Sequence, residues 1–204
     1  MPTNTTPMFK LPLRGLIAGF RRFTVAEYHT LLEMGMITED DNLELLDGHL
    51  VKKMSRNPPH DGTLRKVEKR IQRVLLPPWD TRSQMGVTLS ASEPEPDLAV
   101  VREDPSGYTT RHPAPADVGL LIEVADTSLD TDRSDKVPLY AQDGIVEYWI
   151  VNIPERQIEV YTQPSGPTAL PAYGARQTYR PGQSIPFVLN SVLVTAILVV
   201  DLLP

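Results

Sequence analysis

Two short apolar segments, residues 98–101 and 119–125, constrain the fold of this chain most. Their length and composition are typical of strands buried in the centre of a sheet. The second segment reads Gly-Leu-Leu-Ile-Glu-Val-Ala, so one carboxylate, Glu123, interrupts it. In a strand, residues 121, 123 and 125 share one face, and residues 120, 122 and 124 share the other. We therefore expect Glu123 to project from a buried strand.

The carboxylate of Glu123 needs a partner, because an isolated charge among apolar neighbours is costly to desolvate. A lysine or a metal ion would meet this need, and a buried ion pair is the structural alternative. Asp97 follows Pro96 at the start of the other apolar segment. Two carboxylates that converge from adjacent strands suit hard divalent cations such as Mg²⁺. The alternative for Asp97 is a cap of the loop after Pro96.

Two further residues are candidates for the same site. Lys136 lies on a predicted helix, with Tyr140 one turn later on the same face. A lysine can lower the pKa of a metal-bound water or stabilise charge that develops on a phosphate. The alternative is a surface lysine near a helix N-terminus. Glu44, which precedes the turn Asp47-Gly48, is either a site acid or an exposed residue of a hairpin strand.

The remaining patterns predict an α/β sheet with mixed strand directions. Helices are expected at 25–34, where Thr24 and Glu27 form a capping box, at 60–76 and at about 134–142. Strands are expected at 43–46, 49–54, 87–91, 98–101, 119–125, 146–152 and 157–162, with a terminal core strand at 192–200. Loops are expected at 57–59 and 102–118, and irregular hairpins or a loop at 163–186. Residues 1–22 are interpreted as an N-terminal arm and residues 23–204 as a single domain.

The composition excludes several kinds of site. The chain has 204 residues and no cysteine, which excludes disulfides, thiol nucleophiles and thiolate zinc sites. The lack of cysteine also fits a reducing cytoplasm. No segment approaches the roughly 20 apolar residues of a membrane span, and no secretory signal is evident. We therefore expect a cytoplasmic protein with no membrane segment.

The net charge of −6 argues weakly against a nucleic-acid partner, but the charge is unevenly distributed. Residues 52–73 include eight basic and two acidic residues, so this stretch carries +6 and the remainder of the chain −12. Such a strip predicts a phosphate-binding face, and a solvated helix face is the alternative. The basic residues that we assign to nucleic-acid binding are Lys52, Lys53, Arg65, Lys66, Lys69, Arg70 and Arg73.

Around these residues the sequence resembles the Uma-two family of endonucleases, in the PD-(D/E)xK restriction-endonuclease-like superfamily. The resemblance runs from about residue 23 to 161 and rests on four segments in the right order. They are residues 43–48 (LELLDG), 92–101 (SEPEPDLAVV), 120–125 (LLIEVA) and 132–150 (DRSDKVPLYAQDGIVEYWI). Such a resemblance implies a restriction-endonuclease-like fold, with a mixed central sheet flanked by helices. It also implies magnesium-dependent hydrolysis of phosphodiester bonds, with manganese able to substitute.

The resemblance also assigns roles to individual residues. Asp97 and Glu123 become metal ligands, with the Val124 carbonyl as a further ligand. The lysine that the superfamily has two residues after the second acid is Ala125 here, and Lys136 matches the lysine of this family's own segment. Glu44 matches an upstream acid, while His60 and Tyr140 become residues that line the site.

The expected substrate is nucleic acid, with DNA favoured and RNA, strand type and sequence preference left open. The resemblance suggests a homodimer as the assembly. The strand regions 147–151 and 158–161 are candidates for the dimer contact. The main rival interpretation is a non-catalytic module with a nuclease fold that binds nucleic acid or a protein partner, since fold does not guarantee chemistry. A glycosidase with paired carboxylates is disfavoured, because aromatic residues, which usually form sugar-binding platforms, make up only 6% of the chain.

Overall fold

A computed structural model describes residues 21–54 and 56–204. Most of the expected N-terminal arm, residues 1–20, lies outside the described residues. The described end of the arm and the residue after it are held against a hairpin turn. Arg22 Nη1 donates to Asp47 Oδ1 at 3.0 Å, and the Phe23 amide donates to the Gly48 carbonyl at 2.7 Å.

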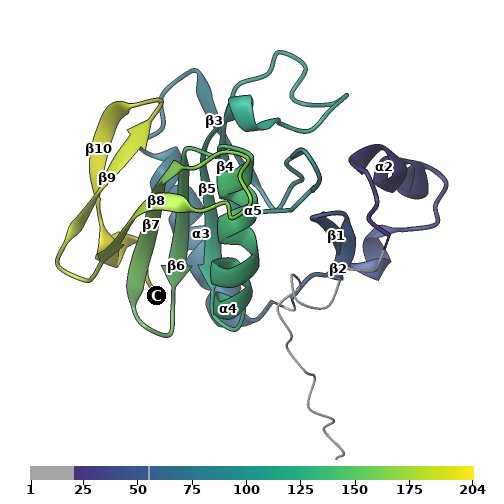
Figure 1. Ribbon diagram of the computed structural model, residues 1–204. Helices are drawn as coiled ribbons and strands as arrows, with labels where there is room; N and C mark the ends of the chain where they lie inside the picture. The colour runs from purple at the N-terminus through teal and green to yellow at the C-terminus, as the bar shows by residue number, and fades with distance from the viewer. Residues whose placement is uncertain (1–20, 55) are drawn as a thin grey trace, which may run out of the picture.

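The centre of the fold is a six-stranded mixed sheet, in the order β3-β4-β5-β6-β7-β8 (Figure 1). Only β5 and β6 pair in parallel, and the other neighbours are antiparallel. This confirms the predicted mixed α/β sheet. The strands are β3 (Trp79–Ser83), β4 (Leu98–Arg102), β5 (Val118–Ala125), β6 (Glu147–Asn152), β7 (Gln157–Pro164) and β8 (Tyr173–Tyr179).

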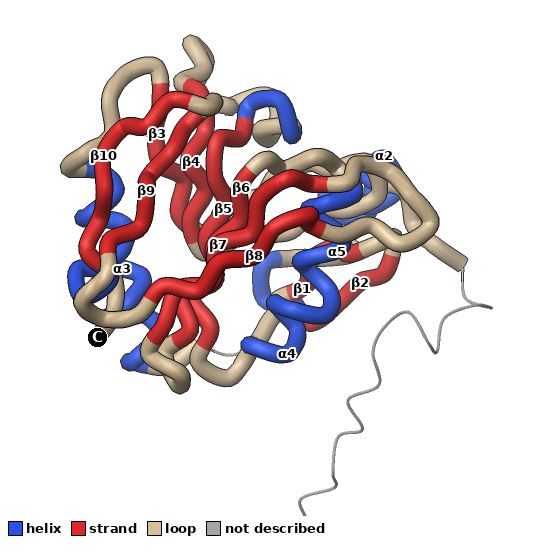
Figure 2. Tube along the Cα trace, turned by 60° about the vertical axis from the view of Figure 1, so that its left-hand side comes forward, coloured by secondary structure: helices blue, strands red, loops and turns tan. Residues whose placement is uncertain are grey.

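The side chains of β5 alternate between the two faces of the sheet and join a different hydrophobic core on each face, as their alternation predicts. Leu120, Ile122 and Val124 join a core with α3 (Pro58–Gln72) and with the hairpin of β9 (Ser184–Leu189) and β10 (Val192–Leu198). Leu121 and Ala125 pack in a second core with α5 (Val137–Gln142). Figure 2 shows α3 and α5 on opposite sides of the strands. Glu123 belongs to the α5 side of β5.

A small N-terminal lobe adjoins the sheet (Figure 1). It consists of α2 (Val25–Glu33), the short η1 (Glu39–Asp41) and the hairpin of β1 (Leu43–Leu46) and β2 (His49–Lys52). The predicted capping box of Thr24 and Glu27 is present. The Glu93 amide donates to the Leu45 carbonyl at 2.7 Å. The segment before β4 therefore pairs with β1 and connects the N-terminal lobe to the sheet.

The connection from β5 to β6 is more irregular than the predicted helix at 134–142. It runs through α4 (Leu129–Thr131), the π-helical η3 (Asp132–Lys136) and α5. Pro138 has no N–H to donate to the carbonyl of Ser134, which is consistent with the wide turn before α5. This turn directs Lys136 toward β5.

Several predicted elements are wrong. No strand forms at 87–91, because the backbone bonds to loop residues; the Val87 amide donates to Pro94 and the Thr88 amide to Pro113. The polar edge strand β3 lies where no strand was predicted. Residues 163–186, expected to form irregular hairpins or a loop, contain β8 and the start of β9. Helix α3 begins at Pro58, capped by Asn57, and ends four residues early, at Gln72.

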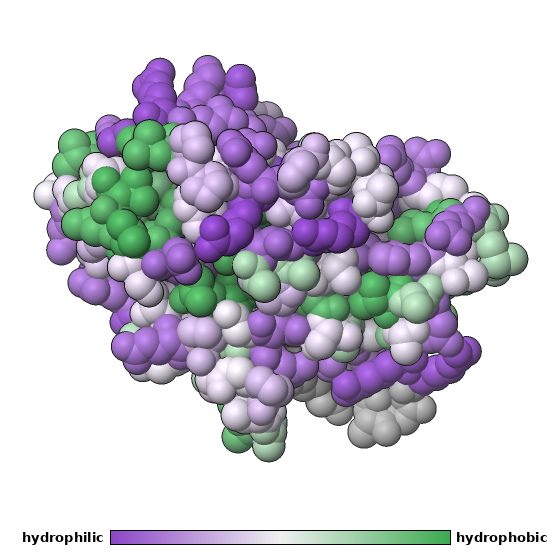
Figure 3. Space-filling model, turned by 90° about the horizontal axis from the view of Figure 1, so that it is seen from above, coloured by the Kyte–Doolittle hydropathy of each residue, from purple (hydrophilic) through white to green (hydrophobic). Residues whose placement is uncertain are grey.

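The C-terminal strand is only in part the core strand that its composition predicts, since Ile197 is buried in the core but most of β10 is not. β10 pairs only with β9, apart from the main sheet, and the short η4 (Val199–Asp201) follows it. Val192 and Leu193 of β10 are more than half exposed. Figure 3 shows apolar surface gathered at the end of the molecule that this hairpin forms.

The strand regions expected to form a dimer contact are also unsuited to that role. Both β6 and β7 are internal strands, with β5 and β8 on their outer sides. Their backbone edges are therefore already paired within the chain and cannot pair with a second copy.

Candidate active site

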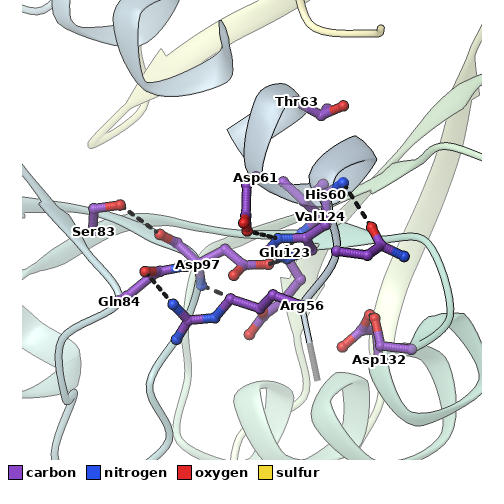
Figure 4. A network of polar contacts seen from close by, with 12 residues as sticks. Arg56, His60, Asp61, Thr63, Ser83, Gln84, Asp97, Glu123, Val124 and Asp132 are labelled. Atoms are coloured by element: carbon purple, nitrogen blue, oxygen red, sulfur yellow. Dashed lines mark hydrogen bonds and ion pairs between the residues drawn. The ribbon is translucent and has the colours of Figure 1, made fainter. Parts of the chain in front are cut away.

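The predicted acids and the lysine meet in a cavity of about 230 Å³ between the N-terminal lobe and the end of β5. Glu44, His60, Asp97, Glu123 and Lys136 all line it. They come from β1, α3, the start of β4, β5 and η3, so segments far apart in the chain form the cavity. Figure 4 shows His60, Asp97 and Glu123 grouped together, with Asp132 across the cavity.

Asp97 lies at the entry of β4, where it is held by two donors. Its Oδ2 accepts from the Val124 amide at 2.8 Å and from His60 Nε2 at 3.0 Å. Burial alone would raise the pKa of the Asp97 carboxyl, but the hydrogen bond and charge of His60 outweigh it. The pKa therefore falls below its ordinary value, so Asp97 is a carboxylate at neutral pH. Among the described residues, no hydrogen bond engages its Oδ1.

Glu123 is 3% exposed and has partners at both oxygens. Its Oε1 accepts from Lys136 Nζ at 2.8 Å and from the Tyr140 hydroxyl at 3.0 Å. Its Oε2 accepts a long bond of 3.3 Å from the Asp97 amide, which places the two acids side by side. Burial raises the pKa of Glu123, Lys136 lowers it, and the charge of Asp97 raises it again, so the pKa lies well above the ordinary carboxyl range.

Lys136 is the only lysine or arginine that the described structure places in direct ion-pair contact with Glu123. Burial would lower its pKa, but the charges of Glu123 and Glu44 reverse this and raise the pKa well above its ordinary value. The amine therefore stays charged. The cavity is nevertheless lined by more acidic than basic side chains, since seven Asp and Glu residues face it against Lys136, Lys52, Lys53 and Arg56.

Two acids of the cavity are more deeply buried than the sequence indicates. Glu44 is 6% exposed rather than on an open hairpin face, and its Oε2 accepts from the Glu95 amide at 3.2 Å. Asp132 is 2% exposed, accepts from Ser128 Oγ at 2.6 Å and lies 3.8 Å from Lys136 Nζ. Sequence reasoning missed Asp132; its position one helical turn before Lys136 was the available signal.

His60 contacts Asp97 directly, although it was expected only to line the site. Asn57 caps α3 by accepting from the His60 amide at 3.0 Å, which fixes the first turn of the helix beside β4. The hydrogen bond to Asp97 raises the pKa of His60, burial opposes it, and Asp61 adds a second contact at 3.2 Å. The ring therefore gains a proton more readily than a free histidine.

The predicted basic strip is divided between two surfaces. Lys52 and Lys53 line the cavity. Lys66, Lys69, Arg70 and Arg73 instead line a separate hollow of about 420 Å³ beside Asp201. Arg70 pairs with Asp201 at 3.0 Å, and Lys66 donates to the Val200 carbonyl at 3.1 Å. Arg65 pairs with Glu68 at 2.7 Å on the exposed side of α3.

The donor set fits a magnesium ion that is only partly held by protein. Within residues 21–54 and 56–204, no three His, Asp or Glu side chains are grouped closely enough to hold a metal alone. Magnesium, however, commonly binds through one or two carboxylates, several waters and a substrate phosphate. Asp97 Oδ1 and Glu123 Oε2 are the least engaged oxygens of the two adjacent acids. The excess of acidic over basic side chains in the lining also favours a cation there.

The comparisons with known proteins agree with this fold. The model of the Uma2 family, described as "Putative restriction endonuclease", matches residues 25–190. The chain therefore belongs to the Uma2 family, which confirms the resemblance found in the sequence. The description of the family supports a nuclease-like function.

One solved structure with the same fold is described as a "putative nuclease belonging to DUF820" from Anabaena variabilis ATCC 29413. The TM-score is 0.63 at 14% identity, and the match covers 84% of this chain and 96% of the other. No protein of curated function matches the chain. No helix in the described parts of the chain is long and apolar enough to cross a membrane.

Proposed function

We propose that this protein is a magnesium-dependent endonuclease that hydrolyses phosphodiester bonds of DNA, with manganese able to replace magnesium. The observation that carries the proposal is the convergence of Asp97 and Glu123 on one cavity. The Asp97 amide lies 3.3 Å from Glu123 Oε2, and Lys136 lies 2.8 Å from the other oxygen of Glu123. Membership of the Uma2 family supports the nuclease assignment.

In this proposal Asp97 and Glu123 hold the metal, with the Val124 carbonyl as a further ligand. When bound there, the metal would supply Lewis-acid chemistry toward the phosphate and would lower the pKa of a water. Lys136 and Tyr140 hold Glu123 in position, and His60 does the same for Asp97. Glu44 and Asp132 keep the Lys136 amine charged. Lys52 and Lys53 contact the substrate backbone without reading its sequence.

Cleavage of labelled plasmid and linear DNA in Mg²⁺ tests the proposal. We expect nicking or cutting by the wild type and loss of most activity in Asp97→Ala and in Glu123→Ala. Circular dichroism and thermal melting show whether each variant is folded. Cleavage that is equal in the wild type and in both folded variants would rule out this site.

The second candidate function is a non-catalytic module of the same fold, and one observation favours it. Lys136 is already engaged by Glu123 in a buried ion pair, an arrangement that is complete without metal. Metal binding separates the two functions, because a non-catalytic module does not need a divalent ion. The homodimer remains part of the proposal and is tested by analytical ultracentrifugation. The sheet edges β3 and β8 and the apolar β10 are the surfaces open to such a contact.

A further inference from the structure

Arg56 lies where two hollows of the surface meet. The first is the cavity of the candidate active site. The second, of about 550 Å³, lies between the N-terminal lobe and the turn after β3. Lys53, Arg56 and Glu95 line both hollows. An extended ligand that occupies both must therefore pass these three side chains.

Of these three shared side chains, Arg56 is the one whose charge is not balanced by a carboxylate in the described structure. Lys53 Nζ and Glu95 Oε2 form an ion pair at 2.6 Å. Arg56 Nη1 instead donates to the neutral amide oxygen of Gln84 at 2.6 Å. The guanidinium is thus positioned by a contact that leaves its positive charge available.

Lys136 is not available to bind the phosphate of a ligand that enters from solvent. Its amine is 2.8 Å from Glu123 and 3.8 Å from Asp132, and the residue is 8% exposed. Arg56, by contrast, is an exposed residue of the segment between β2 and α3. Figure 4 shows its side chain extended beside the acids of the cavity, with the guanidinium turned toward Gln84.

We propose that Arg56 binds a phosphate of the polynucleotide strand at the active site, and that the strand continues from there into the second hollow. This inference rests on the proposed nuclease function and adds a substrate-binding residue to it. A guanidinium offers two parallel N–H donors to a phosphate, a geometry that lysine lacks. A phosphate could replace Gln84 as the partner of the Arg56 guanidinium. Because Gln84 is neutral, this exchange would leave no buried charge without a partner.

The second hollow holds a further cation along this path. Arg82 lines it, its guanidinium lies over the ring of Tyr108 at 5.1 Å, and its buried Nε has no hydrogen-bond partner within the described chain. Glu93 also lines this hollow, but its carboxylate already accepts from His29 and from Thr88. A polynucleotide strand that continues from Arg56 therefore meets a second arginine, Arg82. The carboxylate of Glu93, in the segment before β4, already has partners within the protein.

The test is equilibrium binding of a short fluorescein-labelled single-stranded oligodeoxythymidine, measured by anisotropy in EDTA so that no cleavage occurs. Wild type, Arg56→Gln, Arg56→Lys and the control Arg180→Gln are compared over a range of KCl concentrations. Arg180 is an exposed arginine in the turn between β8 and β9. Thermal melting confirms that each variant is folded.

We expect Arg56→Gln to weaken binding about tenfold, because it removes a charge-assisted hydrogen bond. The slope of log K against log salt should fall by about 0.7, the value for one phosphate contact on a single strand. Arg56→Lys should retain the slope but not the full affinity, and Arg180→Gln should match the wild type. Equal affinity and slope in Arg56→Gln and wild type would overturn the inference, even if the wild type cleaves DNA. Arg56-dependent binding without any cleavage in Mg²⁺ would support the inference while contradicting the proposed function.

Discussion

Glu159 of β7 is a fully buried carboxylate at the centre of a polar network. Tyr161 OH donates to it at 2.8 Å and Asn152 Nδ2 at 3.0 Å, and Arg176 forms an ion pair at 2.8 Å. Arg133, which lies within η3 beside Asp132, also donates to both of its oxygens. The network thus ties the turn that carries Lys136 to the central sheet.

The perturbation is Glu159→Gln, which keeps the shape and removes the charge. Burial raises the pKa of Glu159, but the hydrogen bonds of Arg133, Asn152 and Tyr161 outweigh it and lower the pKa from 4.5 to about 2. At about 1.4 kcal/mol for each pKa unit, the charged form contributes roughly 3 kcal/mol to folding. Because the folded-state pKa is lowered, this contribution is complete above pH 4.5 and is lost as the pH falls toward 2.

Urea unfolding followed by circular dichroism at several pH values measures the effect. At pH 7 we expect Glu159→Gln to unfold about 3 kcal/mol more easily than the wild type, and the difference should shrink steadily between pH 5 and 3. The matched control is Glu155→Gln, because Glu155 is 3.4 Å from the same Arg133 but its side chain is 47% exposed. This exposed pair should change stability by less than about 1 kcal/mol. A difference for Glu159→Gln that is constant from pH 7 to pH 3 would refute the reasoning.

Three other predictions follow from the same structure. Lys136→Met should destabilise the fold by about 3–5 kcal/mol in thermal or urea unfolding, because it leaves the buried Glu123 unpaired, and a loss below 1 kcal/mol would contradict this. Since the pKa of Glu123 is raised, Mg²⁺ should bind more tightly as the pH rises above the ordinary carboxyl range, and calorimetry in two buffers should show proton release on binding. Glu123→Gln, which removes a proposed ligand, should weaken binding and leave it without proton release. Gly119→Ala should cost about 1–3 kcal/mol, because its Cβ would lie 2.7 Å from the Trp79 ring and 2.9 Å from Leu189, and an unchanged melting temperature would show that these side chains move aside.

The sequence predicts the central part of the fold because β4, β5 and β6 are strongly apolar. The alternation around Glu123 correctly gives the face on which it lies, since a buried strand leaves each side chain only two directions. The edges are harder to predict. β3 is polar, β8 carries glycine, arginine and glutamine, and β9 contains Pro186, so none of them has the pattern of a buried strand. Val87 and Leu89 have that pattern but pack from a loop.

The candidate site is predictable where one residue is out of place in its own segment. Glu123 stands in an apolar strand, and Asp97 stands at the start of another. Asp132 is not out of place in its polar segment, and only its spacing of one helical turn before Lys136 points to the site, because its burial depends on how the π-helical turn of η3 packs under the cavity. The basic strip fails as a single surface for a related reason. Lys66, Lys69 and Arg70 of α3, with Arg73 just after it, lie on the side that faces η4, whereas His60 faces β4.

The central claim is that Asp97 and Glu123 form a metal site that acts on nucleic acid, and a calorimetric titration with Mg²⁺ tests it most directly. The titration is made on the wild type and on Asp97→Ala, each with and without a short DNA duplex, after melting curves have shown that both are folded. The account predicts saturable binding by the wild type, at least when DNA is present, and no such binding by Asp97→Ala. A folded wild type that binds no Mg²⁺ under either condition, or an Asp97→Ala variant that binds it equally well, would contradict the account.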